Sequence, residues 1–100
     1  MSTNQAHVLL LTVELFIPHS NSLKARRKVV KSLLDRIRNR YNAAAAETGF
    51  QDKWQRAELS MAVTGSDLGY LKGLCESMLK FVESESLGTA QLVNWNIEER

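Results

Sequence analysis

Hydrophobic residues alternate with other residues along the first part of the chain. Every second position from Leu9 to Ile17 is apolar, while the positions between them are mixed, from Val8 to Phe16. A period of two predicts a β-strand over about 7–17 with one fully buried face and one partly exposed face. Pro18 ends the strand because proline cannot donate a hydrogen bond to a neighbouring strand.

A helical period follows, over about 23–40, and Ser22 is the expected N-cap residue. The apolar side of this helix comprises Leu23, Val30, Leu34, Ile37 and Tyr41, with Leu33 at its margin. Arg26 falls near the apolar edge. We expect its aliphatic stem to pack there while its charged head reaches out to solvent.

The remaining elements come in the order strand, strand, helix, strand. Alanine-rich 42–48 is expected as a short edge strand, with a turn over 49–54, and 56–64 alternates as a half-buried strand. Gly65, Ser66 and Asp67 cap a second helix that runs to about Glu85. Its apolar side comprises Leu71, Leu74, Cys75, Met78 and Val82, and the last strand, over 91–97, alternates at Val93, Trp95 and Ile97.

This βαββαβ order predicts a single ferredoxin-like α+β domain over residues 7–100. Both crossovers are about twenty residues long, which suits helical connections on one side of an antiparallel sheet. We expect a four-stranded antiparallel sheet with both helices on one face. Residues 1–6 are expected as a short polar tail.

The positive charges are unevenly distributed along the chain. The whole chain has a net charge of +2, yet residues 24–40 hold eight of its thirteen Lys and Arg residues against one acid, Asp35. Such asymmetry indicates an anionic partner without identifying it, and nucleic acid is one candidate. The predicted nucleic-acid-binding residues are Lys24, Arg27, Lys28, Lys31 and Arg38. The alternative is a solvated face that the acidic second helix neutralises, through Asp67, Glu76, Glu83 and Glu85.

Two loops offer further candidate sites. Trp54, Gln55 and Arg56 are a predicted interaction loop, because an exposed aromatic ring among polar groups suits a binding surface. The alternative is a tryptophan folded over the sheet edge. Ser20 and Ser22, at the start of the first helix, are candidates for anion binding, with plain N-capping as the alternative.

Catalytic chemistry finds little support in the sequence. Cys75 is the one cysteine and lies on an apolar helix side, and His7 and His19 lack further ligands at a metal-binding spacing. We therefore expect no catalytic residue, metal or cofactor. An acylphosphatase-like hydrolase is the enzyme that the fold suggests, but it would need an arginine in the loop 18–22, which has none.

The exposed sheet face also bears on function. The strand over 56–64 presents Glu58, Ser60, Ala62 and Thr64 there, without the aromatic residues of an RNA-recognition motif. Apolar residues of the first strand on the same face favour a homodimer through the sheet. The chain lacks a signal-peptide pattern and a membrane-spanning apolar run, so we expect a cytoplasmic protein without membrane contact.

Two motifs resemble those of a known family. Ser-Leu-Lys-x-x-Arg-x-Val-x-x-Ser-Leu at 22–33 and Gln-Asp-x-Trp-Gln-Arg-Ala-Glu-Leu at 51–59 are similar to the YlxP-like family of small bacterial proteins. The resemblance implies a ferredoxin-like fold without an assigned activity. Genes of that family often lie near those of translation initiation factor two and ribosome-binding factor A, which implies a role around the ribosome or RNA. Gly49-Phe50 and the alanine-rich second strand depart from the family's pattern.

Together these features predict a non-enzymatic accessory protein that binds RNA or the ribosome through the basic face of its first helix. The first alternative is a homodimeric protein-interaction module that does not bind nucleic acid. The second is the small acylphosphatase-like hydrolase.

Overall fold

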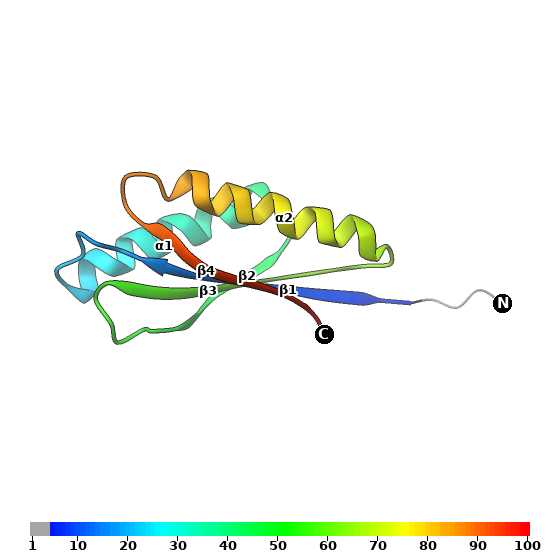
Figure 1. Cartoon of the computed structure of the whole chain (residues 1–100), viewed down its shortest axis with the longest axis horizontal. Helices are drawn as coiled ribbons and strands as arrows, with labels where there is room; N and C mark the ends of the chain where they lie inside the picture. The colour runs from blue at the N-terminus through cyan, green and yellow to red at the C-terminus, as the bar shows by residue number, and fades with distance from the viewer. Residues whose placement is uncertain (1–4) are drawn as a thin grey trace.

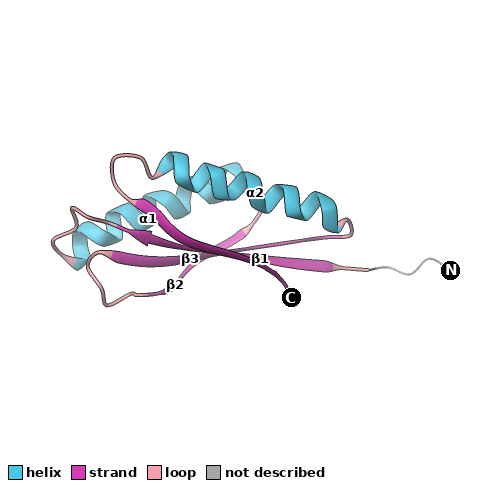
Figure 2. Ribbon diagram, viewed as in Figure 1, coloured by secondary structure: helices cyan, strands magenta, loops and turns pink. Residues whose placement is uncertain are grey.

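A computed structural model describes residues 5–100, so most of the expected tail over 1–6 lies outside the described residues. Six elements follow one another: β1 (His7–Phe16), α1 (Leu23–Arg40), β2 (Ala44–Gly49), β3 (Arg56–Gly65), α2 (Leu68–Glu85) and β4 (Gln91–Glu99). The sheet order is β2-β3-β1-β4, and every neighbouring pair is antiparallel. Both helices cover one face of the sheet (Figure 1, Figure 2). The ferredoxin-like α+β prediction is confirmed.

The core lies between the sheet and the two helices. β1 buries every second residue, as its alternation predicts, and β3 does the same from Ala57 to Val63. These two central strands meet the apolar sides of both helices. The helix residues that are buried in this core are Val30, Leu33, Leu34 and Ile37 from α1 and Leu71, Cys75, Met78 and Val82 from α2.

Local signals fix the helix ends. The Ser22 hydroxyl accepts from the Ala25 amide at 3.0 Å, and the Asp67 carboxylate accepts from the Tyr70 amide at 3.1 Å, so both helices begin at the predicted caps. After α2 the chain turns through Gly88, whose φ of +87° is a left-handed conformation that glycine adopts without steric cost.

The alternation expected in the last strand is interrupted. The pairing of β4 with β1 shifts register between Glu14 and Leu15, so that Leu15 pairs with Leu92 while Glu14 pairs with Asn94. Val93 is the extra residue of this bulge. Leu92 and Ile97 pack against the core, whereas Val93 and Trp95 remain 51% and 52% exposed.

Arg26 also differs from the expectation, because its head does not reach solvent. The residue is 1% exposed. Its Nε donates to the Arg56 carbonyl and its terminal nitrogen donates to the Phe50 carbonyl, each at 2.8 Å. The guanidinium also forms an ion pair with the Glu47 carboxylate. A guanidinium near an apolar edge can turn inward when buried carbonyls accept its hydrogen bonds and a carboxylate balances its charge.

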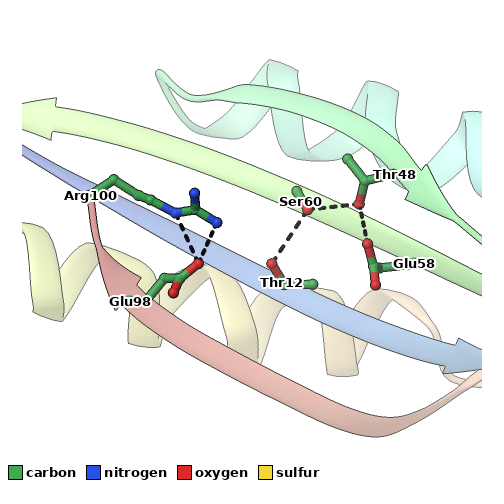
Figure 3. A network of polar contacts seen from close by, with 6 residues as sticks. All are labelled: Thr12, Thr48, Glu58, Ser60, Glu98 and Arg100. Carbon is green, nitrogen blue, oxygen red and sulfur yellow. Dashed lines mark hydrogen bonds and ion pairs between the residues drawn. The ribbon is translucent and has the colours of Figure 1, made fainter.

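The opposite face of the sheet is open and partly polar. Hydroxyl groups form a row across three strands: Thr48 contacts Ser60 at 2.8 Å, and Ser60 contacts Thr12 at 3.4 Å (Figure 3). Thr48 also donates to the Glu58 carboxylate at 2.6 Å. The predicted composition of this face is confirmed, since aromatic residues do not occupy its two central strands apart from Phe16.

Candidate functional site

The eight basic residues of 24–40 differ in their surroundings. Arg26 is internal. Arg36 forms an ion pair with Glu85 of α2 at 3.3 Å, which is the one ion pair between the two helices among residues 5–100. The acidic second helix therefore neutralises one flank of α1 and not its whole basic surface.

Asp35 partly neutralises two of the five predicted nucleic-acid-binding residues. It lies 2.9 Å from Lys31 and 3.8 Å from Arg38. Arg38 also donates to the Ala45 carbonyl of β2, at 2.5 Å. Exposed pairs of this kind are weak, so Lys31 and Arg38 remain available in part.

The other three predicted residues, Lys24, Arg27 and Lys28, occupy the first two turns of α1. All three are exposed, and within residues 5–100 none of them forms an ion pair or a side-chain hydrogen bond. Their Cα atoms span about 6 Å along the helix axis. We call Lys24, Arg27 and Lys28 the basic cluster.

The predicted interaction loop lies at the same end of the molecule. The loops 17–22, 50–55 and 86–90 all lie at the end where α1 begins, on the left of Figure 1. The Ile17 amide donates to the Gln55 carbonyl at 2.8 Å, and the Gln55 side chain donates to the Pro18 and Ser20 carbonyls at 3.3 and 3.4 Å. The β2–β3 hairpin is therefore attached to the loop that precedes α1.

The three residues of the predicted interaction loop have different surroundings. Trp54 is 54% exposed. Gln55 makes the contacts just described. Arg56 forms an ion pair with Glu14, and its guanidinium lies 5.9 Å from the centre of the Phe50 ring. Of the three side chains, the indole of Trp54 is the one without an internal partner among the described residues.

The hydroxyls of the predicted anion site are engaged within the chain. Ser22 caps α1, and Ser20, which is 4% exposed, donates to the Ser22 carbonyl at 3.1 Å. The N-capping interpretation is thus confirmed for Ser22. Anion binding at Ser20 and Ser22 stays a prediction.

A groove between the helices was not predicted from the sequence. It has a volume of about 780 Å³, and its lining includes Arg36, Arg40, Tyr41, Ser77 and Phe81. The Arg40 guanidinium lies 5.5 Å from the Phe81 ring centre, and the Tyr41 and Ser77 hydroxyls are 2.8 Å apart. Two helices must be placed side by side before such a groove becomes visible, so helical periodicity alone could not reveal it.

Cys75 lies in the core, as its position on the apolar side of α2 predicts. Burial, and to a smaller degree the neighbouring Glu76 carboxylate, raises the pKa of its thiol. A raised pKa suppresses the thiolate, so this cysteine is poorly suited to act as a nucleophile. Within residues 5–100, no three His, Cys, Asp or Glu side chains are grouped as metal ligands would be.

Neither helix is long and apolar enough to cross a lipid bilayer. The fold and the site together define a small ferredoxin-like α+β domain with a basic helix end beside an exposed tryptophan.

Comparison with known proteins gives the family. A family model described as a protein of unknown function, DUF503, matches residues 8–97. The chain is also 34% identical over 71 residues to a Bacillus subtilis protein described as uncharacterized protein YlxP, covering 71% of this chain and 77% of that protein. The chain belongs to the DUF503 family, and the YlxP-like resemblance is confirmed.

Solved structures share the fold at low sequence identity. MupZ from Pseudomonas fluorescens has a TM-score of 0.59 at 11% identity, over 97% of this chain and 71% of that chain. The de novo designed protein Foldit4 has a TM-score of 0.57 at 10% identity, over 96% and 97% of the two chains. The Bacillus subtilis YXEP protein, described as a dinuclear metal-binding peptidase of the M20 family, has a TM-score of 0.51 at 16% identity, over 94% of this chain and 25% of that chain. These likenesses concern the fold alone.

Proposed function

We propose that this protein is a non-enzymatic cytoplasmic accessory protein that binds RNA through the basic face of α1. One observation supports the proposal above the others: the basic cluster is exposed and has no internal partner within residues 5–100. Cations in this state can exchange solvent counterions for phosphates, and counterion release favours binding. The resemblance to the YlxP-like family directs the proposal toward the ribosome or ribosome-associated RNA.

The ion pairs of α1 determine how far each of its basic residues is available to phosphates. The basic cluster provides the main phosphate contacts. Lys31 and Arg38 add weaker contacts, because each shares the Asp35 carboxylate. Arg26 and Arg36 stay with their internal partners.

A direct test measures RNA retention on a filter at low salt. We expect the wild-type protein to retain RNA, and the variant Lys24→Gln/Arg27→Gln/Lys28→Gln to lose most of this binding. The matched control Lys72→Gln/Lys80→Gln/Arg100→Gln also removes three positive charges, but from outside α1, and should retain it. Absence of binding by the wild type at low salt, or equal loss in both variants, would contradict the proposal.

A homodimer through the open sheet face is the second candidate function. The observation in its favour is a hollow of about 460 Å³ on this side of the molecule, lined in part by Val8, Ala44 and Ala62. The hydroxyl row from Thr48 to Thr12 places a polar band across three strands of this face, which argues against a large apolar interface. Light scattering distinguishes the candidates, because a dimer mass that Val8→Glu converts to a monomer mass would support the sheet-face interface.

A further inference from the structure

Trp54 is an exposed aromatic residue that does not belong to the hydrophobic core. Its side chain packs against no other aromatic ring and lies under no cation among the described residues. At 54% exposure, a large part of the indole faces solvent. An exposed tryptophan of this kind can bind a partner with a flat, apolar surface.

The β2–β3 hairpin that presents Trp54 is held firmly at its base. The buried Arg26 donates to carbonyls on both sides of the turn, at Phe50 and Arg56. Phe50 itself has a φ of +59°, a conformation that costs a non-glycine residue free energy and that these contacts maintain. Gln55 adds a second attachment, to the loop before α1. Trp54 is therefore presented from a pre-organised turn, which lowers the entropy cost of binding.

The hairpin lies on the side of α1 that carries Arg27 of the basic cluster. Arg38 donates to the Ala45 carbonyl, so this side of the helix faces β2, the strand that leads into the hairpin. Arg27 lies about 20° from Arg38 around the helix axis, since eleven residues at 100° per residue complete three turns and about 20°. The first turns of α1 and the loop 50–55, which carries Trp54, therefore lie at the same end of the molecule (Figure 1) and together offer one surface there.

We infer that this surface binds a single-stranded RNA segment, with one base stacked on Trp54 and the adjoining phosphates at the basic cluster. The inference rests on the proposed function and adds the class of RNA. In a duplex the bases are stacked within the helix and cannot reach an indole, whereas loops and single strands expose them. The aromatic platform of this domain is thus the hairpin, because the central strands of its sheet lack one.

The chain provides a matched control for the stacking residue. Trp95 on the edge strand β4 is 52% exposed, almost the same fraction as Trp54, and lies outside the three loops beside the basic cluster. The test compares Trp54→Ala with Trp95→Ala, using a labelled oligonucleotide in single-stranded form and the same sequence in a duplex. Circular dichroism checks that both variants are folded.

We expect the wild type to bind the single strand more tightly than the duplex. Trp54→Ala should weaken single-strand binding about tenfold, from the ~1–3 kcal/mol that one stacked base contributes, and leave duplex binding unchanged. Trp95→Ala should leave both affinities unchanged. In Trp95→Phe, Trp54 is the one remaining tryptophan, and its fluorescence should be quenched by the single strand.

One contrary result would overturn only the stacking inference, and another would overturn the proposed function as well. If both forms of RNA bind equally well and Trp54→Ala has no effect, while Lys24→Gln/Arg27→Gln/Lys28→Gln abolishes binding, the stacking inference is wrong and the proposed function stands. If neither form binds at low salt, both are wrong.

Discussion

Arg26 shows how one residue connects the basic helix to the rest of the fold. Its position near the apolar edge of α1 is evident from the sequence, but its partners are not. The carbonyls of Phe50 and Arg56 lie 24 and 30 residues away along the chain, and the carboxylate of Glu47 faces it only after β2 is in place. One of the eight positive charges of the basic segment is therefore structural.

Replacement of Arg26 should destabilise the protein strongly. Arg26→Leu leaves two carbonyls without their donor and the Glu47 carboxylate without its cation, which we expect to lower the free energy of unfolding by about 3 kcal/mol. Arg26→Lys should also destabilise, because an ammonium group lacks the planar fork that serves these partners. Urea denaturation measures both changes. Arg27→Leu, at an exposed neighbour, is the control, with an expected change of about 0.5 kcal/mol or less. Equal effects at the two positions would contradict this role.

The buried thiol of Cys75 predicts a pH dependence of stability. Its pKa is raised in the folded protein, so above the ordinary thiol pKa of about 8.5 the unfolded chain releases a proton that the folded protein retains. The free energy of unfolding should therefore fall as the pH rises above that value. This part of the fall should be missing in Cys75→Ala. Parallel stability curves of wild type and Cys75→Ala between pH 8 and 10 would refute the prediction.

At the scale of the elements, periodicity and capping residues predict most of the structure. Ser22 and Asp67 begin both helices as expected, and the predicted strand ends lie within about two residues of the observed ones. The bulge at Val93 could not be predicted, because it depends on the pairing of β4 with β1. Strand pairing joins residues far apart in the sequence, and a local pattern does not record it.

Two glycines should respond to alanine in opposite directions. Gly88 has a φ of +87°, so Gly88→Ala should lower the free energy of unfolding by about 1 kcal/mol. Gly73 is an exposed residue within α2, and an added Cβ would meet no atom within 4 Å. Gly73→Ala should therefore raise the free energy of unfolding by about 0.5–1 kcal/mol, through helix propensity. Thermal denaturation measures both, and changes of the same sign would be inconsistent with the turn and helix described.

At the scale of the whole molecule, the sequence shows where the positive charges are concentrated. It does not show which of them form ion pairs in the fold. Helical geometry places Lys24, Arg27, Lys28, Lys31 and Arg38 on one arc. Only the fold shows that Glu85 pairs with Arg36 and that Lys24, Arg27 and Lys28 form no ion pair within residues 5–100. The position of Trp54 beside this end likewise depends on how the hairpin packs against α1.

The proposed function requires the basic cluster to contact phosphates. The most direct measurement is the affinity for a single-stranded RNA oligonucleotide over a series of salt concentrations, with wild type, Lys24→Gln/Arg27→Gln/Lys28→Gln and Lys72→Gln/Lys80→Gln/Arg100→Gln. Each phosphate contact contributes about −0.7 to the slope of log affinity against log salt, so loss of the cluster should make that slope shallower by about 2. The control variant should keep the wild-type slope. Equal slopes for all three proteins would show that these side chains do not contact phosphates, and would contradict the proposed function.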